Sequence, residues 1–460
     1  MNDPLLYLET LGCPKNQADS RQISAIFNQR GYVLSPDPQE AEVILLNTCG
    51  FIDEAKEESI HAILQLSNWK EKGRCRVLIV FGCMVQKYRE EMEEFLPEAD
   101  AYFGVNEEPA LFAYIDRYTA QAYPIPATQA PAPEFMQANY FADSYYRALP
   151  PSYREEPAGY IKIAEGCSHP CTFCVIPQIK GGYRSRKPAS ICAEAADRAA
   201  KGLKELILVA QDTAAYGRDL SPASSLAELV TSLTAIEDLE RIRILYCYPE
   251  GIDEALIQAM KHPKVCPYLD MPIQHIDDAL LQQMGRPMDS RQIKRVIHRL
   301  REAVPDIALR TTCLLGFPGE SAEAFQSLMD FLEAYRLERV GFFAFSPQPD
   351  TLAGQMPNQV PADEKERRLA VAQGKRDLLL RGRLDELVGR TLSILIDEKS
   401  GEDENLYYYE GRSVWDAPEI DAVVSFSSRH RLRPGQIVSV KITHSKDYIL
   451  SGEIADESCQ

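Results

Sequence analysis

The sequence contains no apolar run that approaches the length of a membrane span, and residues 1–4 show no basic start followed by an apolar segment. Positive charge is also scarce, because 50 Lys and Arg stand against 68 Asp and Glu, for a formal charge of −18. A chain with this balance does not favour general binding of nucleic acid through phosphates, whereas its field attracts a basic partner. The sequence therefore predicts a cytoplasmic protein with no membrane association and no strong affinity for free nucleic acid.

Cysteine, by contrast, is abundant, and twelve cysteines in a chain of this predicted location indicate metal or redox use instead of a disulfide framework. Three of them stand in the loop Cys167-Ser-His-Pro-Cys171-Thr-Phe-Cys174. The C-x-x-x-C-x-x-C spacing can place three thiolates on one iron–sulfur cube and leaves the fourth iron open to a substrate or cofactor. A zinc site is the alternative, but zinc usually takes four ligands and only His169 lies nearby.

The first 115 residues alternate between apolar strand patterns and helix patterns. Strands are predicted at 5–9, 43–47 and 76–81, and helices at 17–30, 53–66 and 87–95. This alternation predicts an open parallel sheet with helices between its strands.

Cys13, Cys49 and Cys83 each follow the carboxyl end of one of these strands. The carboxyl ends of parallel strands line one edge of an open sheet, which is where ligands bind. We therefore expect the three thiols to converge and to hold a second iron–sulfur cluster. The alternative is three half-buried structural thiols, since free cysteine packs as a small hydrophobe. Cys75 precedes its strand, at the opposite edge, and is excluded.

A Pro- and Ala-rich linker over about 116–156 precedes a second alternating series. Its strands are predicted at 159–164, 205–210, 242–247, 268–271, 308–315 and 340–345. Six β/α units in this length predict a partial (β/α)6 barrel, whose active site lies at the carboxyl ends of the strands. Gln211 and the turn from Gly316 through Gly319 to Glu320 stand at such ends, and the turn should offer free N–H groups to a ligand. Arg310, inside an apolar strand, needs a partner, for which a ligand carboxylate is a candidate.

Short alternating strands after residue 389 predict a small antiparallel β-barrel. Barrels of this kind often bind RNA, yet residues 389–456 carry eight Lys and Arg against twelve Asp and Glu, a balance of 8 minus 12, or −4. An acidic barrel repels phosphate and suits a basic protein. The preceding basic helix pattern, 365–383, is either a solvated face or a contact with ribosomal RNA.

The cysteine loop, with Phe173 just before its last cysteine, resembles the radical S-adenosylmethionine (SAM) superfamily. The three-cysteine leading domain and the small terminal barrel resemble the methylthiotransferase family within it. Segments 10–16, 47–52 and 411–421 are similar to the branch of that family that modifies an aspartate of small-subunit ribosomal protein twelve. The resemblance covers nearly the whole chain and implies four parts: a methylthiotransferase domain (1–115), a linker (116–156), a radical SAM core (157–388) and a TRAM domain (389–456).

The resemblance also implies two 4Fe–4S clusters and SAM as cofactors. Cys167, Cys171 and Cys174 would hold the cluster that binds SAM, and Cys13, Cys49 and Cys83 an auxiliary cluster that carries sulfur. The expected SAM neighbours are Phe173, Gln211, Arg310, Gly316, Gly319 and Glu320. One SAM would methylate the sulfur, and a second would yield the radical that abstracts hydrogen from the aspartate β-carbon. No side chain is expected to act as a catalytic base.

The partners implied are the basic ribosomal protein, free or in the assembled subunit, and an electron donor such as flavodoxin. The chain departs from the family pattern at Lys180, which replaces a usual Arg, at Ala422, which replaces a Gly, and at Ile449, which replaces an acidic residue. Two alternatives stay open: a tRNA adenosine methylthiotransferase, against which the acidic barrel counts, and a non-catalytic iron–sulfur electron carrier.

Overall fold

The computed structural model describes residues 4–50, 52–122, 156–403 and 406–455, so most of the predicted linker lies outside the described residues. The described chain divides into two compact units, which are treated separately below. Unit 1 comprises residues up to 153 together with 165–168 and 175–190, and unit 2 comprises 154–164, 169–174 and 191–460.

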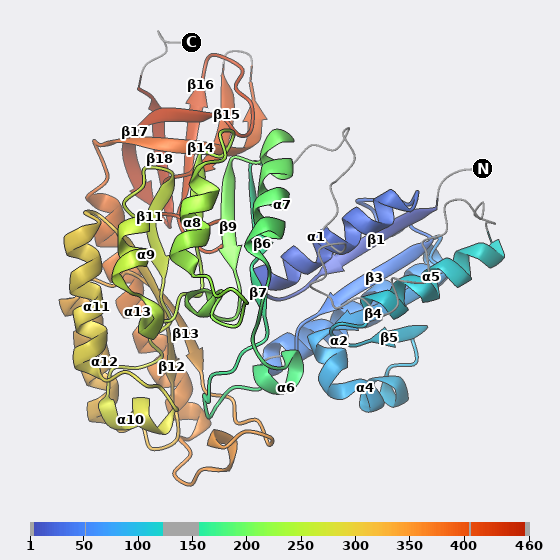
Figure 1. Ribbon diagram of the computed structural model, residues 1–460, viewed down its shortest axis with the longest axis horizontal. Helices are drawn as coiled ribbons and strands as arrows, with labels where there is room; N and C mark the ends of the chain where they lie inside the picture. Colours follow the sequence, from blue (N-terminus) through green and yellow to red (C-terminus); the bar gives the residue numbers. More distant parts are fainter. Residues whose placement is uncertain (1–3, 51, 123–155, 404–405, 456–460) are drawn as a thin grey trace. The chain divides into compact units, whose positions relative to one another are not determined.

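The centre of unit 1 is a five-stranded sheet with the order β2-β1-β3-β4-β5, in which every neighbouring pair is parallel. Its strands are β1 (Leu5–Thr10), β2 (Val33–Leu34), β3 (Val43–Thr48), β4 (Val77–Gly82) and β5 (Ala101–Phe103). The predicted open parallel sheet is confirmed. The sequence did not predict its two short edge strands, β2 and β5. Helices α1 (Pro14–Gln29), α2 (Asp53–Ser67), α3 (Trp69–Lys72), α4 (Cys83–Phe95), α5 (Glu108–Ala122) and α6 (Ile176–Lys180) belong to the same unit (Figure 1).

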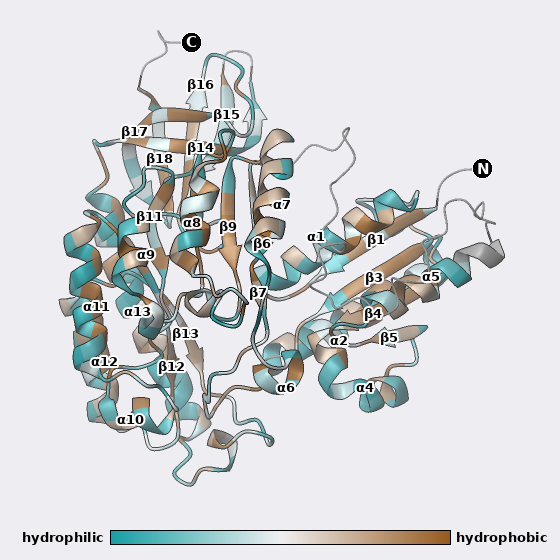
Figure 2. Cartoon of the chain, in the orientation of Figure 1, coloured by the Kyte–Doolittle hydropathy of each residue, from teal (hydrophilic) through white to brown (hydrophobic). Residues whose placement is uncertain are grey.

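Strands β3 and β4 are buried along their whole length, and both are apolar over most of it (Figure 2). Apolar clusters form on both faces of the sheet: Ile79 belongs to the cluster that includes Phe27 of α1, and Leu78 to the one that includes Ile63 of α2. A parallel sheet covered on both faces requires continuous apolar strands, and this requirement explains why they stood out in the sequence.

Unit 2 contains a six-stranded sheet with the order β13-β12-β11-β10-β9-β6, again parallel throughout. Its strands are β6 (Ala158–Lys162), β9 (Glu205–Val209), β10 (Arg241–Ile244), β11 (Val265–Asp270), β12 (Ala308–Leu315) and β13 (Arg339–Ala344). The first and last strands in this order do not pair, so the predicted partial barrel is confirmed. A further short pair, β7 (Ala164–Glu165) and β8 (Arg184–Ser185), stands before and after the cysteine loop in the sequence, and all of its residues except Ala164 belong to unit 1.

Several helices of unit 2 begin at side chains that cap them. Asp277, Asp289 and Ser321 each accept a backbone N–H of the first turn, which satisfies one of the donors that a helix start leaves open. The helices of this series are α7 (Pro188–Ala200), α8 (Leu226–Thr234), α9 (Glu254–Ala259), α10 (Asp278–Gln283), α11 (Ser290–Ala303), α12 (Ala322–Ala334) and α13 (Ala362–Asp385). No helix of the described chain is long and apolar enough to cross a membrane.

The C-terminal part of unit 2 is a closed five-stranded barrel with the order β14-β15-β16-β18-β17. Its strands are β14 (Thr391–Glu402), β15 (Tyr407–Arg412), β16 (Val423–Ser428), β17 (Ile437–Lys446) and β18 (Ile449–Ile454). Four of its five pairings are antiparallel, but β16 and β18 pair in parallel, which corrects the purely antiparallel expectation. Strand directions cannot alternate all the way round a closed ring with an odd number of strands, so one parallel pair is unavoidable.

Candidate iron–sulfur and cofactor sites

The three N-terminal cysteines follow three strands that are neighbours in the sheet of unit 1. Cys13 is the N-cap of α1 after β1, Cys49 follows β3, and Cys83 is the first residue of α4 after β4. The strands are in register at these ends, with Thr10 opposite Asn47 and Thr48 opposite Gly82. The sheet therefore brings the three thiols to one edge, as the sequence predicted.

Polar side chains tie the three strand ends together. The Asn16 side chain donates to the carbonyl of Leu11 at 2.9 Å and to that of Thr48 at 3.3 Å. The Asn47 side chain donates to the carbonyl of Asn16 at 3.2 Å, and the Thr48 hydroxyl to the carbonyl of Phe81 at 2.7 Å. These bonds link the chain around all three cysteines, which explains the polar residues beside the cysteines in 10–16 and 47–52.

Two glycines allow the cysteines to approach one another. Gly12 has φ +92°, and a Cβ there would lie 2.7 Å from Cβ of Cys49. Gly82 has φ +109°, and a Cβ there would lie 2.6 Å from the Asn47 side-chain oxygen. Because side chains at these positions would be both strained and overlapped, only glycine fits immediately before Cys13 and Cys83.

The thiols influence one another electrostatically. Burial raises the pKa of Cys83 to about 12; Lys180 opposes this shift in pKa, whereas Cys13 and Cys49 add to it. None of the three forms a disulfide with another described residue. Among the described residues no three His, Cys, Asp or Glu side chains are grouped closely enough for a single metal ion. A 4Fe–4S cube binds each thiolate at a different iron, so the three thiols need not surround one ion. The positive charge of the iron also offsets the negative charge of the buried thiolates. This donor set therefore fits a cube.

In unit 2 the cysteine loop is fastened to the chain after α10. Thr172 donates its backbone N–H to the carbonyl of Met284 at 3.1 Å and its hydroxyl to that of Gln283 at 2.8 Å. Gly285 has φ +73°, and a Cβ there would lie 2.4 Å from the carbonyl oxygen of Pro170. The loop therefore packs directly on the Gly285 turn, with no room for a side chain between them.

Cys171 lies in a group of charged side chains. A guanidinium N–H of Arg286 donates to its Sγ at 3.8 Å, and Arg286 also pairs with Glu250 at 3.4 Å and lies over the Tyr248 ring at 4.2 Å. Burial raises the pKa of the Cys171 thiol, and Arg286 opposes that rise in pKa. Arg286 thus stabilises the thiolate form that a metal ligand must take.

His169, inside the loop, belongs to the same group. Its Nε2 lies 2.7 Å from a carboxylate oxygen of Asp212, and its ring lies 4.6 Å from that of Tyr248. Sequence analysis did not single out Arg286 or Glu250. The available signal was a lone arginine between Gly285 and a proline, and nothing in the sequence placed it beside Cys171.

The remaining two loop cysteines are held by backbone bonds. Cys167, in unit 1, is buried and donates its backbone N–H to the carbonyl of Gly181 at 3.0 Å. Cys174, in unit 2, donates its backbone N–H to the carbonyl of Cys171 at 3.2 Å. None of the three loop cysteines forms a disulfide with another described residue, and three thiols within eight residues match the donor set of one cube.

Phe173 and Gln211 lie where a cofactor could meet them. Phe173 packs against an apolar cluster that includes Met284, Phe317 and Phe345. Gln211 is buried and comes two residues after the end of β9. Both residues stand at the carboxyl-end side of the unit 2 sheet or on the loop beside it, and their contact with SAM stays a prediction.

The glycine turn of unit 2 does not offer its N–H groups to a ligand. The Glu320 carboxylate accepts the backbone N–H groups of Gly316 and Phe317, and Gly319 donates to the carbonyl of Asn358 at 2.9 Å. Glu320 also pairs with Arg368 of α13 at 3.2 Å. The predicted free donors are therefore wrong: the turn is closed by its own glutamate.

Arg310 likewise has protein partners. It is the third residue of β12 and pairs with Asp421 of the C-terminal barrel at 3.5 Å and with Asp270 of β11 at 3.9 Å. Asp421 also accepts the Tyr268 hydroxyl at 2.8 Å. The predicted need of Arg310 for a charge partner is therefore met within the protein, by a carboxylate 111 residues away in the sequence, and contact of Arg310 with SAM stays a prediction.

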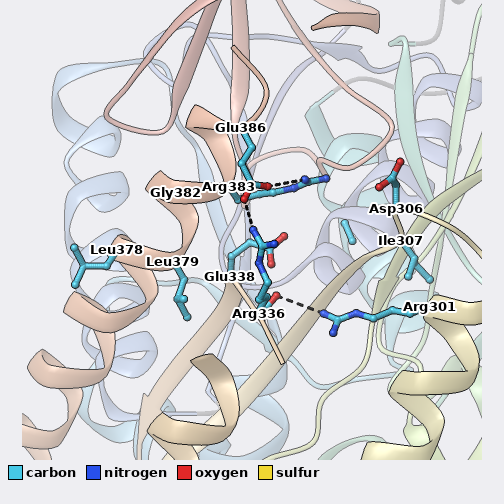
Figure 3. A pocket seen from close by; sticks show the side chains of 11 residues that line it. Arg301, Asp306, Ile307, Arg336, Glu338, Leu378, Leu379, Gly382, Arg383 and Glu386 are labelled. Atoms are coloured by element: carbon cyan, nitrogen blue, oxygen red, sulfur yellow. Dashed lines mark hydrogen bonds and ion pairs between the residues drawn. The ribbon is translucent and has the colours of Figure 1, made fainter. Parts of the chain in front are cut away.

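A cavity of about 430 Å³ in unit 2 lies apart from these features (Figure 3). It is lined by the approach to β12 at Asp306 and by α13, and its charges are paired, for example Arg336 and Arg383 with Glu386. The cavity adjoins the amino end of β12. A partial barrel binds its ligands at the carboxyl ends of its strands, so this cavity lies away from the expected binding face.

Three family models match the chain in the order that the fold suggests. Residues 5–104 match the uncharacterized protein family UPF0004, residues 161–332 the radical SAM superfamily, and residues 388–455 the TRAM domain. Among solved structures, the radical SAM methyltransferase TsrM from Kitasatospora setae is similar in fold, with a TM-score of 0.55 and 17% identity over 77% of each chain.

Curated relatives align with almost the entire chain. The ribosomal protein uS12 methylthiotransferase RimO of Trichlorobacter lovleyi is 42% identical over 97% of both chains, and that of Geobacter sulfurreducens is 41% identical over 97% of both. This chain therefore belongs to the RimO family of radical SAM methylthiotransferases, enzymes that use SAM and 4Fe–4S clusters.

Proposed function

We propose that this protein attaches a methylthio group to the β-carbon of an aspartate in ribosomal protein uS12, protein twelve of the small subunit. In this proposal Cys167, Cys171 and Cys174 hold the cluster that binds SAM, and Cys13, Cys49 and Cys83 hold an auxiliary cluster. Each cluster has three protein ligands and one open iron. When bound, the clusters and two SAM molecules supply reductive cleavage of SAM, the methyl group and the sulfur.

The observation that carries the proposal is the convergence of three cysteines from three adjacent strands in unit 1, in a chain that has a second triad in one loop. A non-catalytic electron carrier usually closes the fourth position of its cluster with another cysteine. This chain has two sets of three cysteines, and each set leaves one iron of its cluster without a protein ligand. This arrangement supports chemistry at the clusters. The apolar cluster against which Phe173 packs supports the same proposal because it gives one side of the loop an apolar surface.

The chain's own residues orient and tune these groups. Arg286 favours the thiolate of Cys171, and Glu250 and Tyr248 hold Arg286 in place. Asp212 orients the His169 ring within the loop. We keep Phe173 and Gln211 as proposed SAM neighbours. Arg310 and the Gly316, Gly319 and Glu320 turn serve first to hold unit 2 together.

Charge supports a basic protein substrate. The chain carries −18 overall, and residues 389–456 carry eight basic against twelve acidic residues. Such a field speeds encounter with a basic ribosomal protein and opposes contact with tRNA phosphates. We also propose that the protein works in the cytoplasm and takes its electrons from a donor such as flavodoxin.

The test is an anaerobic reaction of reconstituted enzyme with SAM, a reductant and sulfide, offered either uS12 or unmodified tRNA, followed by mass spectrometry. A methylthio mass gain on one aspartate of uS12 is the expected result. A gain on a tRNA adenosine would overturn the substrate and retain the chemistry. SAM cleavage with no gain on either would mean a different acceptor.

Two variants assign the clusters. Cys171→Ala should lose SAM cleavage, because the loop would retain two thiols. Cys49→Ala should still cleave SAM and insert no sulfur. If Cys49→Ala modifies uS12 at the normal rate, the assignment of the auxiliary cluster to Cys13, Cys49 and Cys83 is wrong.

A further inference from the structure

A buried lysine of unit 1 lies beside the three-cysteine edge. Lys180 is the last residue of α6 and is only 6% exposed. Its Nζ lies 3.6 Å from a carboxylate oxygen of Glu165 and 3.7 Å from one of Asp19. Both distances exceed that of a hydrogen bond. Within the part of the chain that the structure describes, the ammonium therefore meets these two carboxylates at ion-pair distance, beyond hydrogen-bond distance.

Three observations relate this ammonium to the cysteines. Ile179, the neighbour of Lys180, shares an apolar cluster with Cys83. Asp19 lies on α1, whose N-cap is Cys13. The charge of Lys180 also acts on the thiol of Cys83, whose pKa it lowers against the larger effect of burial.

An ammonium is costly to bury because it loses its hydration, and carboxylates at ion-pair distance replace only the charge interaction. Its N–H donors still require acceptors. A 4Fe–4S cube with three thiolates, and with a sulfur anion on its open iron, is negatively charged and presents sulfur atoms that accept hydrogen bonds. Hydrogen bonds to such sulfurs and nearby charge are among the factors that set the reduction potential of a cluster.

We propose that Lys180 is a positioning residue that holds the auxiliary cluster and its sulfur anion by donating hydrogen bonds to their sulfur atoms. This role rests on the proposed assignment of Cys13, Cys49 and Cys83. The positive charge stabilises the reduced cluster, which carries one more electron, and so raises its potential. It also retains hydrosulfide or methanethiolate at the open iron by charge and hydrogen bonding.

The test uses the full chain with Cys171→Ala, so that only the auxiliary cluster is measured. Its midpoint potential is followed by EPR during a redox titration. Lys180→Met should lower the potential by about 59 mV or more, a tenfold change in the equilibrium constant of a one-electron couple. Lys180→Arg should restore it. The control is Lys70→Met in the same unit, which removes a lysine paired with Asp100 near the amino end of β4 and should leave the potential unchanged.

A second readout is hydrosulfide binding, measured by titrating the same proteins with sodium sulfide and recording the EPR spectrum. Lys180→Met should bind at least tenfold more weakly, and Lys180→Arg should bind normally. If Lys180→Met does not fold, Lys180→Gln provides the comparison, because it keeps N–H donors without the charge. An intact cluster with unchanged potential and unchanged sulfide affinity in the neutral variant would overturn the role of Lys180. Absence of any cluster from the Cys171→Ala parent would instead overturn the assignment of the three cysteines.

Discussion

Glu205 is the centre of a buried charge cluster that joins the partial barrel of unit 2 to the C-terminal barrel. It is the first residue of β9 and is fully buried, as is its partner Arg243. Its carboxylate lies 2.6 Å from Nε of Arg243 on β10 and 3.1 Å from a guanidinium nitrogen of Arg412 on β15. Arg412 also pairs with Asp397 at 2.7 Å. We predict that Glu205→Gln destabilises unit 2 substantially, because it leaves the Arg243 guanidinium without its carboxylate.

Two estimates of the magnitude agree. Removing one partner of a buried ion pair typically costs about 3–5 kcal/mol. Burial alone would raise the pKa of Glu205, but Arg243, Arg412 and Arg241 together lower it to about 2, from an ordinary value of 4.5. A shift of that size corresponds to roughly 3 kcal/mol, at about 1.4 kcal/mol for each pH unit. Because the folded-state pKa is depressed, this stability is fully present above pH 4.5 and is lost as the pH falls from 4.5 toward 2.

The assay is urea unfolding followed by tryptophan fluorescence in a Trp69→Phe background. The chain has two tryptophans, and the other, Trp415, belongs to unit 2 and therefore reports its unfolding alone. The matched control is Glu254→Gln, which removes an exposed partner of Arg299 and should leave the unfolding midpoint unchanged. A loss below about 1 kcal/mol in Glu205→Gln would refute the reasoning. So would a parallel loss of stability in variant and parent between pH 4.5 and 2.

Three further predictions concern the turns around the sites. Gly285→Ala should reduce SAM cleavage at least tenfold, because the new Cβ would overlap Pro170 and displace the cysteine loop. The far-UV circular dichroism spectrum should stay normal. Normal SAM cleavage by this variant would contradict the prediction. The Gly12→Ala variant should contain roughly half of the parent's iron, measured by chemical analysis, because the strained alanine would press on Cys49 and prevent one of the two clusters from binding. A full iron content would show that the overlap does not occur. Glu320→Gln should cost roughly 1 kcal/mol in urea unfolding, because the backbone N–H groups of the turn lose a charged acceptor while Arg368 keeps Glu364; burial raises the pKa of Glu320, so its charged form is only weakly favoured. An unchanged midpoint would show that the turn closes without the carboxylate.

The order of elements could be read from the sequence because parallel strands buried on both faces are continuous apolar runs. The strands that carry Cys13, Cys49 and Cys83 were predicted within one or two residues of their observed ends. Strands β2 and β5 were missed because two- and three-residue edge strands carry too little pattern. The parallel pairing of β16 with β18 follows from closing five strands, a number that the sequence did not reveal.

The expectations about Arg310 and the glycine turn depended on which distant residue satisfies a given polar group. Arg310 was expected to meet a ligand, but Asp421 meets it from the next barrel. The glycine turn was expected to have free donors, but Glu320 occupies them and Arg368 of α13 holds Glu320. Partner choice depends on how barrels and helices pack together, and sequence spacing carries no information on contacts of that range.

The sequence by itself determined the class of chemistry, because the spacing of cysteines and their position after strands are local properties that do not depend on tertiary contacts. It also determined the two parallel sheets through the periodicity of their strands. Only the tertiary structure decided that the charge of Lys180 acts on the Cys83 thiol, that Arg286 reaches Cys171, and that Glu205 lies among arginines. A buried charge takes its role from the neighbours that folding brings to it, and those neighbours come from elements far apart in the chain.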